Sequence, residues 1–260
     1  MSVTSTVVSG GDMSAQNIYD DPEFLAGYVT LDRQIHGLDG AAEWPTLQSM
    51  LPDMDGRRVV DLGCGFGWFT RWAGEHGAAT VLGVDVSTKM LERARSETAA
   101  SNIAYRCADL DLVDLEPGTA DVVFSSLTLH YVRDLSRLMS MVAASLTPRG
   151  SVVFSVEHPI YSAPTTQRFE TSDAGDRIWP LDNYLVEGER VTNWFVDGVV
   201  KEHRTVATYA NTMIESGLVL DRIEEFGSPA EAAEAAGPRP ESADDRHRPW
   251  FLLLKATKAD

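Results

Sequence analysis

The stretch VVDLGCGFGWFT, residues 59–70, indicates the class of fold. An apolar run ends in Asp61, and glycines follow at the alternate positions Gly63, Gly65 and Gly67. Glycine-rich turns after a strand usually hold a nucleotide, but a dinucleotide site spaces its glycines G-x-G-x-x-G. A carboxylate at the end of the strand would also repel a pyrophosphate and attract a cation. The stretch therefore disfavours a dinucleotide.

Strand-like and helical segments alternate over much of the chain. Apolar strand patterns occupy residues 57–62, 80–86, 102–110, 120–127 and 150–158, with helical patterns between them. This alternation predicts an α/β fold with a parallel, doubly wound sheet. A helix over 205–216 and strands over 218–226 and 250–257 follow. Residues 158–202 show no regular pattern, and we expect an irregular segment there.

Composition and charge exclude several classes of protein. The chain has 260 residues, a formal net charge of -17 and two cysteines, Cys64 and Cys107. The acidic balance disfavours nucleic acids and anionic membranes as partners. Two cysteines cannot build a disulfide framework, which favours a cytoplasmic location. Residues 1–16 lack the basic and apolar regions of a secretory signal, and we expect a disordered leader there.

Polar residues end successive strands of the predicted sheet, where open parallel sheets bind ligands. Asp85 ends the second strand, 18 residues after Gly67, at a place where an acid can accept hydrogen bonds from ribose hydroxyls. Asp109 ends the third strand and can reach the exocyclic amine of an adenine. Met90 and Leu110 offer apolar surface to the ring. These residues predict a ligand with adenine, one ribose and a cationic tail.

Four motifs, in order and at the proper spacing, resemble the class I S-adenosylmethionine-dependent methyltransferases. They are D-L-G-C-G-F-G (61–67), D-x-S-x-x-M (85–90), A-D-L (108–110) and S-S-L-T-L-H-Y (125–131), and the resemblance covers roughly residues 55–225. It implies a Rossmann-like seven-stranded sheet with helices on both faces and S-adenosylmethionine as the cofactor. The donor-binding residues that we expect are Tyr28, Arg33, Asp61, Gly63, Gly65, Asp85, Val86, Met90, Asp109, Leu110 and Ser126.

The segment N-I-Y-D-D-P-E-F-L-A-G-Y (17–28) resembles the N-terminal part of bacterial small-molecule methyltransferases. That likeness implies a helical lid over residues 17–54, with Tyr19 and Tyr28 above the donor and Tyr19 in a catalytic role. It also implies Arg33 near the donor's carboxylate, which suits paired hydrogen bonds. The alternative is an amphipathic helix docked on the sheet edge. The methyltransferase domain is expected over residues 55–260, with residues 158–202 inserted after the fifth strand.

Missing motifs narrow the expected chemistry to metal-free methyl transfer to a small molecule. Ser125-Ser126-Leu127-Thr128 replaces the N/D-P-P-Y/F motif of nucleic acid amino-methyltransferases. The acid cluster of the catechol-type enzymes is absent, and two cysteines cannot hold the iron–sulfur cluster of a radical mechanism. The absence of an acid cluster slightly favours nitrogen over oxygen or carbon as the methylated atom.

The rim beyond the fourth and fifth strands is expected to bind the acceptor. His130 and His158 are candidate bases, although His130 could instead satisfy a backbone carbonyl and Glu157 could be structural. The expected walls of the acceptor pocket are Tyr131, Glu157, Tyr161, Trp179 and Trp194. Two other functions stay open, an NAD-dependent oxidoreductase and a catalytically silent S-adenosylmethionine-binding protein. A homo-oligomer is compatible with the sequence.

Overall fold

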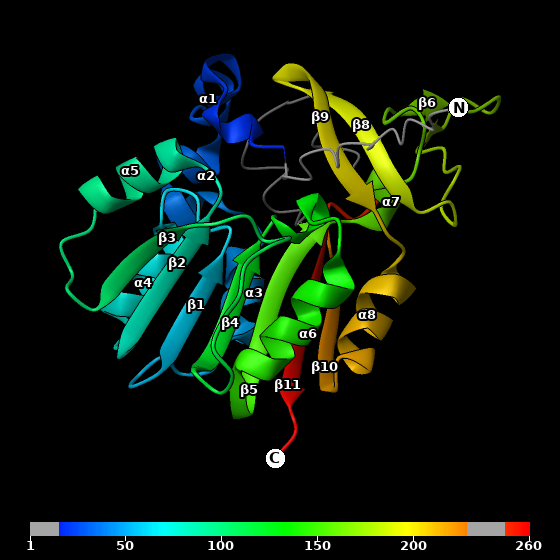
Figure 1. The fold of residues 1–260 in the computed structure, drawn as a ribbon. Helices are drawn as coiled ribbons and strands as arrows, with labels where there is room; N and C mark the ends of the chain where they lie inside the picture. Colours follow the sequence, from blue (N-terminus) through cyan, green and yellow to red (C-terminus); the bar gives the residue numbers. More distant parts are fainter. Residues whose placement is uncertain (1–15, 228–247) are drawn as a thin grey trace, which may run out of the picture.

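A seven-stranded sheet forms the centre of the molecule (Figure 1). The computed structural model describes residues 16–227 and 248–260, so the expected leader lies almost wholly outside the described residues. The strand order is β10-β11-β5-β4-β1-β2-β3. The strand bounds are β1 (Arg58–Leu62), β2 (Thr80–Asp85), β3 (Ile103–Cys107), β4 (Ala120–Ser126), β5 (Leu146–Glu157), β10 (Leu218–Phe226) and β11 (Phe251–Lys258).

The five strands from β1 to β5 pair in parallel, as the alternation of strands and helices predicts. The strands β10 and β11 add an antiparallel extension beside β5. The strand order reverses between β1 and β4, and open sheets of this kind bind ligands beside such a reversal. The third strand is shorter than the expected 102–110, and the fifth begins four residues earlier than the expected 150.

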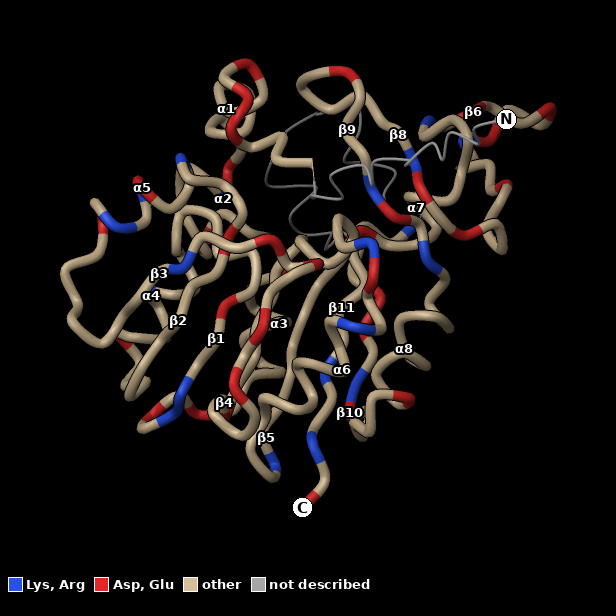
Figure 2. Tube along the Cα trace, in the orientation of Figure 1, with Lys and Arg blue, Asp and Glu red and all other residues tan. Residues whose placement is uncertain are grey.

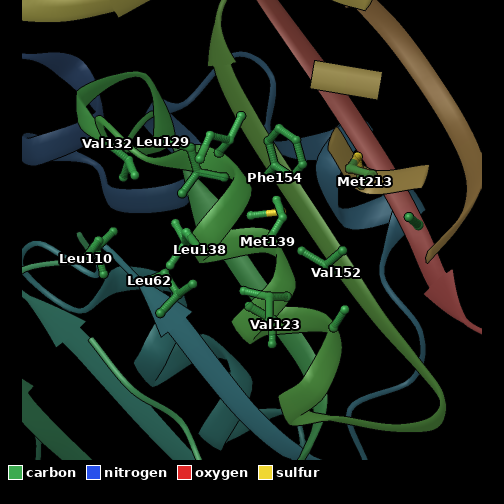
Figure 3. Packing of buried hydrophobic residues seen from close by; sticks show 14 of the residues in the cluster. Leu62, Leu110, Val123, Leu129, Val132, Leu138, Met139, Val152, Phe154 and Met213 are labelled. Carbon is green, nitrogen blue, oxygen red and sulfur yellow. The ribbon is translucent and has the colours of Figure 1, made fainter. Parts of the chain in front are cut away.

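Helices cover both faces of the sheet because successive side chains along each buried strand point to opposite sides. One face packs on α6 (Leu135–Ser145) and α8 (Val206–Glu215), and Leu138, Phe154 and Met213 meet in that core (Figure 3). The other face packs on α3 (Trp44–Met50) and α4 (Trp68–Glu75). The helix α5 (Thr88–Ser96) lies against β2 and β3 and is capped by Ser87, whose hydroxyl accepts a hydrogen bond from Met90 N.

The N-terminal segment consists of short helices that lie above the carboxyl ends of the strands (Figure 1). These are η1 (Ile18–Asp20), α1 (Pro22–Tyr28), α2 (Asp32–Ile35) and η2 (Gly37–Gly40). Asp21 caps α1 by accepting hydrogen bonds from Glu23 N and Phe24 N. Asp20 accepts hydrogen bonds from Ser87 Oγ at 2.6 Å and Lys89 N at 3.2 Å, so the segment is fastened to the start of α5.

Residues 158–202 are more regular than the sequence predicts. They hold α7 (Pro159–Ser162), the short pair β6 (Glu170–Thr171) and β7 (Arg177–Ile178), and most of a hairpin, β8 (Gly188–Trp194) and β9 (Val196–His203). Side chains along β8 alternate only between half-buried and exposed, so no strongly apolar face marks the strand in the sequence. The hairpin extends above the sheet on the β5 side (Figure 1). Its turn residue Phe195 packs against Gly27, where a side chain would collide with the ring.

Candidate functional site

A cavity of about 400 Å³ lies at the carboxyl ends of the parallel strands. Its walls come from the glycine turn after β1, the ends of β2 to β5, the N-terminal segment, the insertion and the start of β11. Asp and Glu are spread over the whole trace, and Lys and Arg stand between them (Figure 2). Both signs of charge also occur in the cavity lining, where Asp85, Asp109, Asp111 and Glu157 stand with Arg33 and Arg248.

The glycine turn forms the floor of the cavity. Gly63 and Gly65 line it with φ angles of +76° and +51°, while Gly67 precedes α4 and stands outside the lining. Gly63 N donates to Val84 O at 2.7 Å, which ties the turn to β2. A Cβ at Gly63 would stand 2.1 Å from Thr128 Oγ1. The sequence therefore needs glycine there, both for the left-handed conformation and for the close approach of the loop after β4.

Asp85 ends β2 and presents a fixed carboxylate to the cavity. Its Oδ2 accepts a hydrogen bond from Gly65 N at 2.9 Å, and its Oδ1 accepts one from Ser87 N at 2.9 Å. Burial raises the pKa of this carboxyl, and hydrogen bonds from backbone N–H groups act in the opposite direction. Each carboxylate oxygen has two lone pairs, so both oxygens can still accept a hydrogen bond from a ligand.

The wall beside Asp85 has the mixture of apolar surface and acids that the sequence predicts for it. Val86, Met90, Asp109 and Leu110 all line the cavity. The neighbouring Asp111, which sequence reasoning missed, also lines it and accepts hydrogen bonds from Arg133 N and Asp134 N. The loops after β3 and before α6 are therefore joined at this wall.

Asp61 lies beneath the glycine turn and not on the cavity wall, contrary to the contact expected from its position at the strand end. It is 2% exposed, and its Oδ2 accepts a hydrogen bond from Thr70 Oγ1 at 2.7 Å. Burial raises its pKa from 3.8 to about 7, against the effect of the Thr70 hydroxyl. The hydrogen bond shows that Asp61 links β1 to α4.

The raised pKa of Asp61 predicts a pH-dependent stability. The folded state binds the proton of Asp61 more tightly than the unfolded state does. The contribution of this proton to the stability of the fold is therefore full below about pH 4 and is lost as the pH rises through about 7. Between these values the free energy of unfolding should fall by up to about 1.4 kcal/mol per pH unit from this group. The free energy of unfolding, measured by urea titration at each pH, should fall less steeply with pH for Asp61→Asn than for wild type. Parallel curves for the two proteins would contradict the assignment.

The N-terminal segment supplies one side of the cavity through Tyr19, Tyr28 and Arg33. Tyr19 donates to the hydroxyl of Tyr131 at 3.3 Å, and burial raises the pKa of both phenols, so both stay protonated at neutral pH. The hydroxyl of Tyr28 accepts a hydrogen bond from Gln34 Nε2 at 2.8 Å. Arg33 reaches the cavity, but its Nη2 already donates to both oxygens of the buried carboxylate of Glu43, at 2.7 and 3.0 Å.

The cavity is also lined by Ser126 at the end of β4 and by His130 and Tyr131 of the helix that follows, η3 (Leu129–Tyr131). His130 is 4% exposed, and its Nδ1 accepts a hydrogen bond from Glu157 N at 3.4 Å. Burial lowers the pKa of His130 to about 4, so the ring is neutral at physiological pH. With Nδ1 accepting, the proton of the neutral ring is on Nε2, which is a donor rather than a base.

Glu157 ends β5, lines the cavity and pairs with Lys201 of β9, whose Nζ lies 2.6 Å from Glu157 Oε1. Burial is the largest single influence on the pKa of Glu157 and raises it, but the charge and hydrogen bond of Lys201 act together with neighbouring basic side chains to lower the pKa overall. The ammonium also lies 5.0 Å from the ring centre of Trp194, another lining residue. Lys201 joins the hairpin to the sheet, and nothing in its local sequence distinguishes it from an exposed strand lysine.

His158 and Trp179 are not brought to the cavity. The ring of His158 accepts a hydrogen bond from Ile160 N at the start of α7, and its Nε2 lies 3.0 Å from Glu225 on β10. Side chains at successive positions point in opposite directions, so Glu157 faces the cavity while His158 faces away. Trp179 stacks on the far side of Tyr161, with ring centres 5.8 Å apart, and only Tyr161 lines the cavity.

Several further lining residues were not among the expected site residues, although Leu127 and Thr128 lie within the motif at 125–131. These further residues are Gln16, Leu31, Leu127, Thr128, Val132, Arg248, Trp250 and Phe251. Arg248 and Trp250 come into place only because β11 pairs with β5, which brings Phe251 opposite Glu157. Within residues 16–227 and 248–260, no three His, Cys, Asp or Glu side chains are grouped as metal ligands. In the same ranges no helix is long and apolar enough to cross a membrane.

Comparison with known proteins places these features in one family. Residues 60–154 match the family described as a methyltransferase domain. An S-adenosylmethionine-dependent methyltransferase of known structure from Mesorhizobium loti is 52% identical, with a TM-score of 0.81, over 85% of this chain and 100% of that chain. A Listeria monocytogenes chain of known structure, proposed to have the same activity, is 38% identical, with a TM-score of 0.75, over 85% of this chain and 99% of that one.

A curated relative also matches, but over a shorter region. The ubiquinone biosynthesis O-methyltransferase of Neisseria meningitidis is 34% identical over 131 residues, which is 45% of this chain and 55% of that protein. The match therefore spans about half of the relative's length.

Proposed function

We propose that this chain, which belongs to the S-adenosylmethionine-dependent methyltransferases and uses that donor, methylates a nitrogen atom of a small molecule. The observation that supports a small acceptor best is the cavity, whose volume of about 400 Å³ is near the lower end of the ~300–1,000 Å³ usual for ligand sites. The donor must share that space with the acceptor. A net charge of -17 further disfavours nucleic acid as the acceptor.

The walls of the cavity suggest how the donor lies. We place its ribose on Asp85, whose two oxygens are held in position by Gly65 N and Ser87 N. Its adenine would lie between Met90 and Leu110, beside Val86 and Asp109. The methionine part would extend over Gly63 and Gly65 toward Arg33 and Ser126. This proposal sets Asp61 outside the direct contacts, since Asp61 does not line the cavity.

The N-terminal segment is proposed to act as a lid over the donor. Asp20 holds it at the start of α5, and Tyr19 and Tyr28 form part of the cavity wall. On its other side it packs on the hairpin, with the rings of Phe24 and Trp194 centred 5.3 Å apart. Closing this segment would exclude water from both the donor and the acceptor.

Bound S-adenosylmethionine supplies a methyl group that its sulfonium already makes electrophilic. The chain's task is then to align the acceptor, which can contribute roughly 7–11 kcal/mol to lowering a barrier. Neutral His130 can donate a hydrogen bond through Nε2, and Tyr131 and Tyr19 can hold the acceptor through their hydroxyls. His130 and Tyr19 are therefore proposed as positioning groups, whereas His158 faces away from the cavity and has no role in the proposed reaction. No metal takes part in the proposed transfer.

Nitrogen is favoured because His130 is poorly suited to act as a base. Its pKa of about 4 makes it a weak proton acceptor at neutral pH, and the phenols of Tyr19 and Tyr131 stay protonated. A neutral amine can attack through its own lone pair and release its proton afterwards, whereas a phenol or a carbon acid must first lose a proton. Methylation of oxygen is the second candidate, since the Neisseria relative acts on oxygen.

Turnover with a panel of acceptors tests this proposal. The purified protein is incubated with S-adenosylmethionine and, separately, small amines, phenols, carbon acids and transfer RNA, and S-adenosylhomocysteine is measured by mass spectrometry. We expect product with at least one small amine. Product only with phenols would replace nitrogen by oxygen, and product only with RNA would overturn the small-molecule assignment. Tight donor binding without product from any class would favour a silent binding protein.

A further inference from the structure

We propose that the acceptor carries an anionic group, a carboxylate or a phosphate, and that the guanidinium of Arg248 binds it. The proposal rests on the proposed function, because it assigns the end of the cavity away from Asp85 to the acceptor. Arg248 lines the cavity together with Glu157 and Tyr161. Neither its charge nor its position is needed for the donor contacts described above.

Arg248 lies on the acceptor side of the sheet. Trp250 N donates to Phe226 O at 2.7 Å, and His158 N donates to Trp250 O at 2.9 Å, so the chain just after Arg248 is fixed to β10 and to the end of β5. The strands β4 and β1 separate β5 from β2, which ends at Asp85. With a spacing of about 4.8 Å between strands, β11 lies on the order of 19 Å from β2 but only about 10 Å from β4.

Aromatic rings hold the guanidinium of Arg248. Its central carbon lies 4.4 Å from the ring centre of Trp179, 4.8 Å from that of Tyr161 and 5.5 Å from that of Phe169. Trp179 is fixed in turn, because its Nε1 donates to Ile160 O at 3.0 Å. Aromatic rings that cover the face of a guanidinium leave its N–H groups directed outward in the plane, which is the geometry that pairs with a carboxylate or a phosphate.

The surrounding charges favour an anion at this end. Glu157 is the acid nearest to this end among the lining residues, and it is already paired with Lys201 at 2.6 Å. Arg248 is within electrostatic range of Glu157 as well. A guanidinium has five N–H donors, which is more than a bidentate bond to an anion uses.

These positions also limit the size of the acceptor. The strands β4 and β11 lie two strand spacings apart, on the order of 10 Å, and Arg248 comes just before β11, so a methylated atom beside Ser126 and an anion on Arg248 are separated by a distance of that order. A short amino acid or a small amine that bears a phosphate meets both requirements. The insertion that supplies Tyr161, Phe169 and Trp179 would then contribute to the choice of acceptor, because it holds Arg248 in place to bind the anionic group.

Binding of simple anions tests the proposal. Protein saturated with S-adenosylhomocysteine is titrated with inorganic phosphate, followed by ³¹P line broadening, and separately with acetate, followed by saturation transfer, both at constant ionic strength. We expect saturable binding of at least one anion, and the tighter of the two identifies phosphate or carboxylate as the acceptor's group. Arg248→Gln should weaken it by about tenfold or more, since charge-assisted hydrogen bonds are lost. Arg248→Lys keeps the charge but loses the paired N–H groups of the guanidinium, so its affinity for the anion should lie between those of wild type and Arg248→Gln.

Controls separate this proposal from the proposed function. Arg222→Gln removes an arginine from β10 that pairs with Glu224 outside the cavity, and it should bind both anions as wild type does. Arg248→Gln should bind S-adenosylhomocysteine normally; if it does not, Arg248→Lys is used for the comparison. Failure of wild type to bind S-adenosylhomocysteine would count against the proposed donor site alone. No saturable anion binding by wild type, or equal binding by Arg248→Gln, would overturn the role of Arg248.

Discussion

Asp85→Ala is expected to lower the affinity for S-adenosylhomocysteine by about 2–4 kcal/mol, which is roughly 30- to 1,000-fold in Kd. The proposed ribose hydroxyls would donate to a carboxylate that lies at the end of β2 and is oriented by Gly65 N and Ser87 N. Because the Asp85 carboxylate is charged and already oriented, its hydrogen bonds to the ribose are expected to be stronger than ordinary exposed ones. Calorimetric titration of wild type and variant measures the loss directly.

Two further variants distinguish loss of the ribose hydrogen bonds from disruption of the structure around Asp85. Asp85→Asn keeps the shape and one oxygen but loses the charge, so its donor affinity should lie between wild type and Asp85→Ala. Asp20→Ala breaks the contacts of the lid with Ser87 and Lys89 and leaves Asp85 in place. It should weaken donor binding less than Asp85→Ala does. Unchanged affinity in a folded Asp85→Ala protein would remove Asp85 from the donor site.

Much of the fold was accessible from the sequence because its signals are local. The stretch 59–70 contains a buried strand, a turn that only glycine fits well and the start of a helix, and the structure has these three parts in that order. The wall residues Asp85, Met90 and Leu110 could be grouped without a structure, because parallel strands end at the same edge of a sheet. The antiparallel pairing of β11 with β5 gave no such signal, so Arg248 and Trp250 were missed.

The direction in which a side chain points was harder to predict than the strand to which its residue belongs. Asp61 and Asp85 both end or nearly end a strand, but only Asp85 lines the cavity, while Asp61 accepts a hydrogen bond from Thr70 below the turn. Glu157 and His158 are neighbours that face opposite ways. A shift of one residue in a strand reverses a side chain's direction, and sequence patterns place strand ends only within a few residues.

Gly63→Ala is expected to be the most destabilising single substitution in the glycine turn. Its φ of +76° disfavours any side chain, at a cost of about 1–3 kcal/mol. The added Cβ would also stand 2.1 Å from Thr128 Oγ1 and 2.6 Å from Thr128 Cβ, so it would push on the body of that side chain and not only on its end. Such overpacking typically costs a further 1–3 kcal/mol. The free energy of unfolding should therefore fall by about 2–6 kcal/mol in urea titrations.

The two parts of this loss can be measured separately. Gly56 has a similar φ of +69°, but no described atom lies within 4 Å of a Cβ placed there, so Gly56→Ala should lose only the backbone part. Adding Thr128→Gly to Gly63→Ala removes the obstructing side chain, and the double variant should recover stability relative to the sum of the two single changes. Because Gly63 and Thr128 both line the cavity, Gly63→Ala should also bind S-adenosylhomocysteine more weakly than Gly56→Ala. Equal losses of stability in Gly63→Ala and Gly56→Ala would mean that the turn needs glycine for its backbone conformation alone and that the loop after β4 adjusts freely.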